Sequence, residues 1–196
     1  APSTGIISGS GEKAGTYDIG LTVSGPAGKT TGTLTIVAGE HKLALTPPMG
    51  WNSWNIWAEK ITADQVREAG RAMVESGLAA KGYRFVNIDD GWQGRRDEDG
   101  ILHPHENFGD MKALADDLHA MGLKLGIYSS PGPETCARRE GSYEHEQLDA
   151  ETWAGWGVDY LKYDWCYYGR IAPEEPTVEE YQKPYRVIRS ALDNID

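Results

Sequence analysis

The chain has 196 residues, of which 39% are hydrophobic and 25% are charged, a composition typical of a globular protein. Its formal net charge of −11 argues against a nucleic-acid partner, because phosphate binding depends on clustered Lys and Arg. No apolar run approaches the ~20 residues of a membrane-spanning helix, so no membrane partner is expected. The seven Trp and ten Tyr suit sugar binding, although such side chains also fill cores.

The first 45 residues are rich in Gly, Thr and Ser. Alternating runs at Thr16–Val23 and Thr33–Val37 flank a turn sequence, Gly25–Gly28, and predict at least two antiparallel strands. These runs resemble the last strands of bacterial Ig-like modules, which take about 100 residues when complete. We therefore predict that residues 1–42 form a partial Ig-like β segment and linker, and residues 43–196 a separate domain. The alternative is a set of strands that merely packs on the domain after it.

From residue 46 onward, predicted strands alternate with predicted helices. Strands are expected near residue 49 and over 83–88, 123–129 and 157–166. Helices are expected over 62–77, 110–121 and 146–156 and from Thr177, where Pro184 limits the last helix to a late first turn or a kink. The strand centres recur every ~35–40 residues, the period of a βα unit with long loops. Four such units predict an α/β fold with a parallel sheet, either doubly wound or half of a (β/α)₈ barrel.

Polar and aromatic residues gather where the predicted strands become loops. The clusters are Gly50–Asn55, Asn87–Trp92, Tyr128–Gly132 and Lys162–Cys166. The carboxyl ends of parallel strands meet at one edge of a sheet, which is where (β/α)₈ enzymes keep their active sites. A dinucleotide-binding fold would need a glycine-rich turn after the first strand, and residues 50–53 do not form one. The sequence therefore favours the first half, four βα units, of a (β/α)₈ TIM barrel.

Two acidic features stand out at these strand ends. Lys162 and Asp164 share one face of the last strand, where a cation would lower the pKa of a catalytic carboxylate. The alternative is a partly solvated salt bridge that closes the strand. The adjacent Asp89 and Asp90 suit the capture of neighbouring hydroxyl groups, because an ionised carboxylate only accepts hydrogen bonds. The alternative for this pair is a calcium or magnesium site.

Four motifs closely resemble the α-galactosidases of glycoside hydrolase family 27, in the same order and spacing over residues 43–170. They are Leu45–Trp54, Asn87–Trp92, Lys124–Tyr128 and Tyr160–Cys166. The resemblance implies a (β/α)₈ barrel followed by a β-sandwich, and retaining hydrolysis of terminal α-galactosides. The expected partner is therefore a galactoside or a galacto-oligosaccharide, and we expect no cofactor and no metal.

The same resemblance assigns roles to the polar strand-end residues. Asp164 matches the nucleophile, and Lys162 matches a ligand of a galactose hydroxyl beside it. Asp89 and Asp90 match the pair that hydrogen-bonds the sugar around O4 and O6. The five His offer no pair with metal-ligand spacing at a strand end, so we expect them to be structural.

Two aromatic residues and two cysteines complete the resemblance. Trp54 matches the platform under the sugar ring and Tyr128 a residue lining the pocket, although both could be packing residues. Cys136 and Cys166 match a disulfide pair, with free thiols in a cytosolic protein as the alternative. Together with the Ig-like segment, a disulfide implies a secreted or periplasmic protein. No signal-peptide pattern begins the chain, so we expect that segment to be absent or removed.

A retaining glycosidase needs a second carboxyl group roughly 5–5.5 Å from its nucleophile. By resemblance this acid/base residue lies beyond residue 196, so we predict that the 196-residue polypeptide alone is inactive. One alternative is a non-catalytic carbohydrate-binding module that keeps Trp54, Asp89 and Asp90. Others are the family's α-N-acetylgalactosaminidases and β-L-arabinopyranosidases, although the two aspartates favour a sugar with a C6 hydroxyl.

Overall fold

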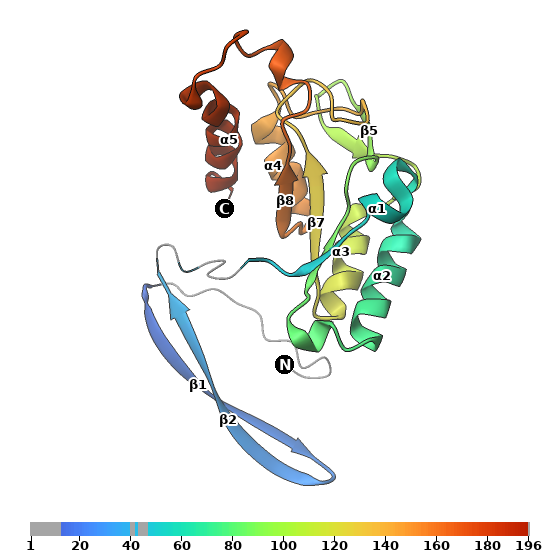
Figure 1. The fold of residues 1–196 in the computed structure, drawn as a ribbon. Helices are drawn as coiled ribbons and strands as arrows, with labels where there is room; N and C mark the ends of the chain where they lie inside the picture. Colours follow the sequence, from blue (N-terminus) through green and yellow to red (C-terminus); the bar gives the residue numbers. More distant parts are fainter. Residues whose placement is uncertain (1–12, 40–41, 43–46, 196) are drawn as a thin grey trace. The chain divides into compact units, whose positions relative to one another are not determined.

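A computed structural model of the chain describes residues 13–39, 42 and 47–195 (Figure 1). The chain divides into two compact units, Ala1–Pro48 and Met49–Asp196. Across these described residues, no helix is both long enough and apolar enough to cross a bilayer.

The first unit contains an antiparallel hairpin of β1 (Gly15–Gly25) and β2 (Gly28–Ala38). The strands pair from Gly15 opposite Ala38 to Gly25 opposite Gly28. Gly28 has a φ of +122°, a conformation that glycine adopts without steric cost, which explains this residue at the turn. The predicted antiparallel strands are therefore confirmed. Their assignment to an Ig-like module and the boundary at residue 42 stay predictions.

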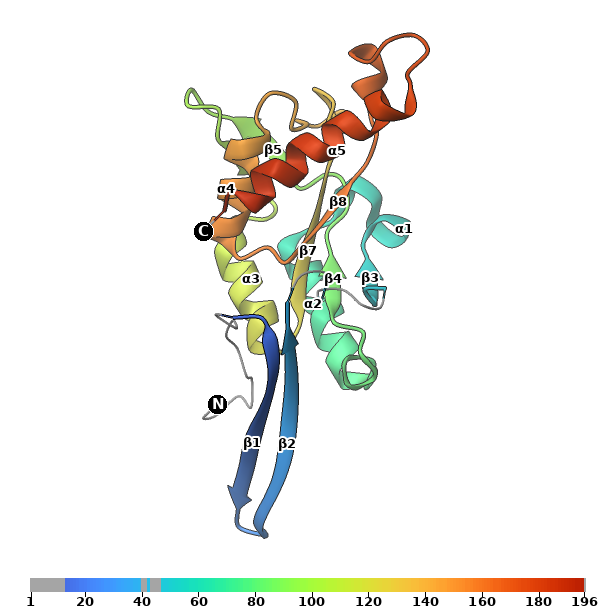
Figure 2. The same cartoon turned by 90° about the vertical axis from the view of Figure 1, so that its left-hand side faces the viewer.

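The second unit contains a parallel sheet of four strands in the order β3-β4-β7-β8 (Figure 2). The strands are β3 (Gly50–Asn52), β4 (Phe85–Asn87), β7 (Lys124–Ser129) and β8 (Tyr160–Tyr163). All four predicted strands are present; the last three are shorter than predicted, and each polar cluster begins within its strand and continues into the loop after it. Since every pair is parallel, the four carboxyl ends lie at one edge of the sheet.

Helices follow the strands, and consecutive long helices contact one another. They are α2 (Ala63–Glu75), α3 (Met111–Ala120), α4 (Glu146–Trp156) and α5 (Val178–Asp193), with a short α1 (Trp54–Trp57) and 3₁₀ turns at Ala58–Lys60, Ala79–Lys81 and Tyr168–Arg170. Capping boxes at Thr62 and Thr177 begin α2 and α5, where the sequence predicted the starts of these helices. Pro184 does not lie in the first turn of α5, because the helix begins at Val178 and continues past this buried proline to Asp193; the alternative of a kink stays a prediction. Pro184 shares the buried face of α5 with Ile188 and Ala191, and this packing favours continuation of the helix.

The core of the second unit lies between the sheet and its helices. Val86 and Leu125, on neighbouring strands, are fully buried together with Leu118 of α3. Gly70 of α2 faces the Leu118 side chain so closely that no room remains for a Cβ atom, so the two helices approach tightly there. Close packing of this kind holds the strands rigidly and therefore also fixes the positions of the loops at their carboxyl ends.

A second hairpin, which we did not predict from the sequence, follows β4. It consists of β5 (Gln93–Arg96) and β6 (Leu102–Pro104). The Arg96 guanidinium binds both carboxylate oxygens of Asp149 on α4, at 2.6 and 2.8 Å, and donates to the backbone carbonyls of Gly100 and Gly141. This ion pair fastens the hairpin to α4. The sequence signal for this hairpin is the Asp99-Gly100 turn between its two strands.

Candidate active site

Hydrogen bonds beyond the strands continue the sheet and bring its polar clusters together. Ser53 donates its backbone N–H to the Asn87 carbonyl at 3.1 Å. Asp89 donates its backbone N–H to the Ser53 hydroxyl at 2.9 Å. Asp164 donates its backbone N–H to the Ser129 carbonyl at 3.0 Å. These bonds join the end of β3 to the end of β4 and the end of β7 to the end of β8, as the parallel sheet predicts.

Lys162 pairs with Asp89, and this corrects the predicted Lys162–Asp164 pair. The Lys162 Nζ lies 2.7 Å from Asp89 Oδ2, and no ion pair joins Lys162 to Asp164 in the described part of the chain. Lys162 lies within β8 opposite Tyr128, and its ammonium group lies 5.0 Å from the centre of the Tyr128 ring. The lysine therefore reaches across β7 to the end of β4, whereas Asp164 has already left the strand.

Asp164 is held by two hydrogen bonds to its carboxylate. Tyr128 donates its hydroxyl to Oδ2 at 3.2 Å, and Trp165 donates its backbone N–H to Oδ1 at 2.8 Å. Burial, together with the nearby charges of Asp164 and Asp90, raises the pKa of Tyr128, so its hydroxyl keeps the proton that it donates. A carboxylate offers about four acceptor positions, so about two remain on Asp164 for another partner.

Cys136 and Cys166 form a disulfide with their Cα atoms 5.0 Å apart. The Cys166 Sγ also lies 3.3 Å from the Tyr128 hydroxyl, which places the disulfide directly beside the side chain that holds Asp164. Among the described residues, Cys136, Asp164 and Cys166 form the one cluster whose ligand atoms could reach a common metal ion. Because the disulfide leaves neither sulfur as a thiolate, this cluster does not fit a metal site.

Asp90 is almost completely buried, and protein groups occupy most of the acceptor positions of its carboxylate. Its Oδ1 accepts from the Thr135 hydroxyl at 2.8 Å and from the Gly91 N–H at 2.9 Å, and its Oδ2 accepts from the Ala137 N–H at 2.7 Å. Burial raises the pKa of Asp90 and outweighs these hydrogen bonds, which act in the opposite direction. By the same count of acceptor positions, about one remains free. Sequence reasoning missed Thr135, because a lone Thr beside a Cys carries no distinctive signal.

The tryptophans differ in solvent exposure, and this difference distinguishes the predicted sugar platform, Trp54, from the tryptophans of the core. Trp54 on α1 is 39% exposed. Trp92 is fully buried and donates its indole N–H to the Tyr128 carbonyl at 2.8 Å. Trp51 and Trp57 pack edge to face, with ring centres 5.6 Å apart, against the core. Trp54 is therefore exposed enough to offer a ring face to a ligand, whereas Trp51 and Trp57 pack against the core.

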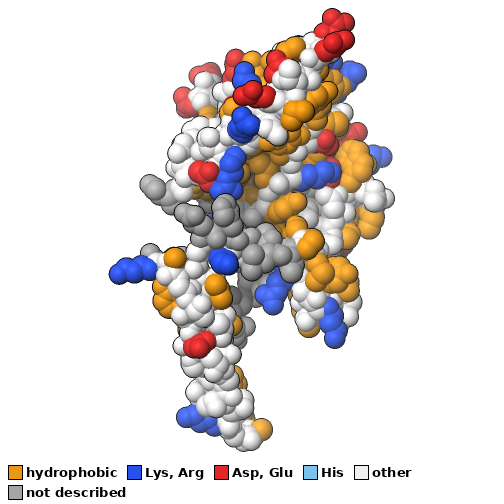
Figure 3. All heavy atoms as spheres, turned by 60° about the vertical axis from the view of Figure 1, so that its left-hand side comes forward, with side chains coloured by type: hydrophobic (Ala, Val, Ile, Leu, Met, Phe, Trp, Pro, Cys, Tyr) orange, Lys and Arg blue, Asp and Glu red, His pale blue; other side chains and the backbone are white. Residues whose placement is uncertain are grey.

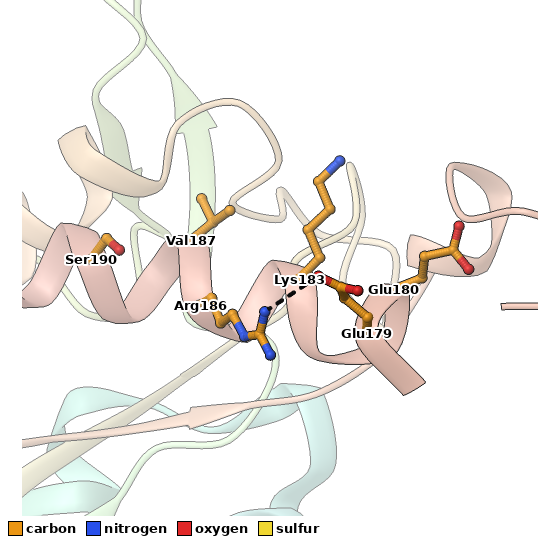
Figure 4. Close-up of a pocket in the computed structure, with 6 residues that line it drawn as sticks. All are labelled: Glu179, Glu180, Lys183, Arg186, Val187 and Ser190. Carbon is orange, nitrogen blue, oxygen red and sulfur yellow. Dashed lines mark ion pairs between the residues drawn. The ribbon is translucent and has the colours of Figure 1, made fainter. Parts of the chain in front are cut away.

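A surface hollow beside α5 lies apart from these residues. It has a volume of about 410 Å³, and it is lined by Glu179, Glu180, Lys183, Arg186, Val187 and Ser190 (Figure 4). All six lining residues belong to one helix, and the pair of Arg186 with Glu179 spans 3.8 Å. Exposed hydrophobic side chains also lie on α5, including Val178 and Tyr181, and Figure 3 shows such side chains at the surface of the second unit. None of the predicted site residues lines this hollow.

The parallel sheet, with polar side chains gathered at the carboxyl ends of its strands, fits the first half of a (β/α)₈ barrel enzyme. The family model Melibiase_2, described as alpha galactosidase A, matches residues 46–195. The chain belongs to this family, glycoside hydrolase family 27. The predicted fold class, with four βα units from the first half of a barrel, is confirmed.

Three relatives illustrate the similarity. An alpha-galactosidase A from Cellvibrio japonicus is 52% identical over 64% of this chain and 32% of its own length. The crystal structure of alpha-galactosidase I from Mortierella vinacea is 40% identical with a TM-score of 0.74, over 79% of this chain and 39% of that one. A structure of the Saccharomyces cerevisiae alpha-galactosidase with raffinose is 37% identical with a TM-score of 0.73, over 77% and 33%. The chain thus spans about a third of the length of these relatives.

Proposed function

We propose that this chain supplies the nucleophile and most of the galactose pocket of a retaining α-galactosidase. The observation that carries the proposal is the Asp164 carboxylate, which projects from the end of β8 and is oriented by Tyr128 and Trp165. Membership of the family supports the substrate class, as does the raffinose in the structure of the yeast relative. The acid/base residue is proposed to lie in sequence beyond residue 196.

In the proposed reaction, the free acceptor positions of Asp164 face the anomeric carbon of an α-galactoside. The bond from Asp164 to this carbon forms as the glycosidic bond breaks, and the departing oxygen takes a proton from the acid/base carboxyl group. Water then attacks the anomeric carbon and gives its proton to the acid/base carboxylate, while the bond from this carbon to Asp164 breaks and restores the Asp164 carboxylate, with net retention of configuration. The Tyr128 hydroxyl orients Asp164 for the first step and favours the second, because its hydrogen bond strengthens as negative charge returns to Asp164.

The neighbouring side chains are proposed to recognise the sugar. Asp89 accepts hydrogen bonds at Oδ1 from Asp90 and at Oδ2 from Lys162, so about two acceptor positions remain for sugar hydroxyls. The Lys162 ammonium group has three N–H bonds, of which Asp89 uses one, so it can also donate to a hydroxyl. The exposed ring of Trp54 supplies an apolar face of the kind on which sugar rings stack.

Azide rescue of the full-length protein tests this proposal. Asp164→Ala should lose activity on p-nitrophenyl α-galactoside by about a thousandfold or more, since it removes the nucleophile. Added azide should restore p-nitrophenol release in this variant and produce galactosyl azide of β configuration, because azide takes the place of Asp164. Asp116→Ala, which removes an exposed carboxylate on α3, is the matched control and should keep full activity. An Asp164→Ala variant with wild-type activity, or without a β-azide product, would contradict the proposal.

The isolated 196-residue chain gives a second, separate test. We expect it to release no p-nitrophenol from an α-galactoside, because it supplies only one of the two carboxyl groups. Release that disappears in the Asp164→Ala form of the same chain would refute this expectation. Equal turnover of α-N-acetylgalactosaminide or β-L-arabinopyranoside substrates by the full-length protein would instead favour the other family activities. A non-catalytic binding module would bind galactose and give no azide product.

A further inference from the structure

Asp90 resembles a sugar ligand in the sequence, yet its carboxylate is largely occupied by a neighbouring loop. Two of its three hydrogen bonds come from that loop, from the Thr135 hydroxyl at 2.8 Å and the Ala137 N–H at 2.7 Å. The loop follows β7, whereas Asp90 follows β4, and 45 residues separate Asp90 from Thr135. The contact therefore joins the ends of two strands through one buried carboxylate.

Thr135 begins the turn of residues 135–139, which faces Asp90. It is fully buried, and its hydroxyl accepts the Arg139 N–H at 3.0 Å while donating to Asp90. Its backbone N–H also donates to the Arg139 carbonyl at 2.8 Å. The hydroxyl is the group that matters here, because a valine of the same size could neither donate to Asp90 nor accept from Arg139.

Cys136 connects this turn to the candidate nucleophile. It lies between the two loop residues that bind Asp90, and its disulfide partner Cys166 lies two residues after Asp164. The Cys166 Sγ touches the Tyr128 hydroxyl at 3.3 Å, and the same hydroxyl donates to Asp164 at 3.2 Å. A shift of the turn would thus be transmitted through the disulfide to the hydrogen bond that orients Asp164.

We infer that Thr135 is a positioning residue, and that its clamp on Asp90 holds the Cys136–Cys166 disulfide and Tyr128 where they orient Asp164. The inference rests on the proposed function for its effect on catalysis, but not for its effect on the loop. A positioning role for Thr135 predicts a different measurement from a role of Asp90 as a sugar ligand alone. If Asp90 served only to bind sugar, loss of the Thr135 hydroxyl would leave the rate of the chemical step unchanged.

The test compares Thr135→Val with Thr135→Ser in the full-length protein. Thr135→Val should lower kcat on p-nitrophenyl α-galactoside by about tenfold with KM changed less than about threefold, because it removes a hydrogen bond to a charged group without removing a sugar contact. Thr135→Ser keeps the hydroxyl and should stay within about twofold of the wild type. Thr152→Val, which removes a hydroxyl bonded to the Leu148 carbonyl on α4, is the matched control and should leave kcat unchanged.

Disulfide reduction supplies a readout that needs no activity. The rate at which dithiothreitol reduces Cys136–Cys166, followed by thiol labelling and mass measurement, should rise about fivefold in Thr135→Val, since a released loop opens more often. If Thr135→Val cannot be obtained folded, Asp90→Asn breaks the clamp from its other side and should accelerate reduction similarly. An inactive wild type would refute the proposed function while leaving this measurement valid. Wild-type kcat and reduction rates in Thr135→Val, or equal losses in Thr135→Ser, would overturn the inference.

Discussion

Lys162 and Asp89 form an ion pair between β8 and the end of β4, with 2.7 Å between Nζ and Oδ2. The carboxylate is almost fully buried, while the lysine is 45% exposed, so solvent screens part of the attraction. The pair bridges strands that are not neighbours in the sheet, since β7 lies between them. It therefore contributes both to the cohesion of the strand ends and to the charge of the proposed sugar pocket.

A double-mutant cycle with Lys162→Met and Asp89→Asn measures this pair. We expect a coupling free energy of about 1 kcal/mol in urea unfolding, because one partner is buried and the other half exposed. The exposed Lys112–Asp116 pair within α3 is the matched control and should give no more than about 0.5 kcal/mol. Equal coupling free energies in the two cycles would show that burial of Asp89 does not strengthen its ion pair with Lys162.

Sequence reasoning succeeded where a signal is local or repeats along the chain. The capping boxes at Thr62 and Thr177 are local, because the cap and its partner lie three residues apart. The βα period places all four strand ends at one edge regardless of side-chain detail. The polar clusters around Asp89 and Asp164 could therefore be predicted as neighbours before any contact was known.

Sequence reasoning failed where a contact depends on how strands that are distant in the chain are aligned. The partner of Lys162 is set by the pairing of β8 with β7 and by the reach of a long side chain, and neither is encoded in the residues around Lys162. The bond from Thr135 to Asp90 is of the same kind, since it joins loops from different strands. Pro184 shows the opposite case, in which tertiary packing overrides a strong local preference.

Breaking the buried ion pair of Arg96 with Asp149 should strongly destabilise the second unit. Asp149 is fully buried and Arg96 nearly so, so Arg96→Met leaves an uncompensated charge. We expect a loss of about 3–5 kcal/mol in the free energy of unfolding, measured by urea denaturation. Arg67→Met removes the more exposed pair with Asp117 and should cost about 1 kcal/mol or less. Similar losses in both variants would disprove this ranking.

The disulfide should contribute about 3–4 kcal/mol to the free energy of unfolding in the loop-entropy model, since it closes a loop of 30 residues. A variant with both Cys136→Ala and Cys166→Ala should unfold at correspondingly lower urea concentration. Dithiothreitol should destabilise the wild type by a similar amount and leave the double variant unaffected. Sensitivity of the double variant to dithiothreitol would mean that the reagent acts elsewhere in the protein.

Asp90 should make stability depend on pH in a direction opposite to that of an ordinary salt-bridged aspartate. Burial raises its pKa in the folded chain above the usual value of 3.8, so the folded state favours the protonated form. This group therefore stabilises the fold below pH ~3.8, and the contribution is lost as the pH rises through the higher folded-state pKa. Asp90→Asn cannot titrate, so its thermal stability relative to the wild type should improve as the pH rises from ~3.8 through the higher folded-state pKa of Asp90. Unfolding midpoints measured at several pH values test this, and a relative stability that falls over the same range would mean that the hydrogen bonds from Thr135 and Ala137 outweigh burial.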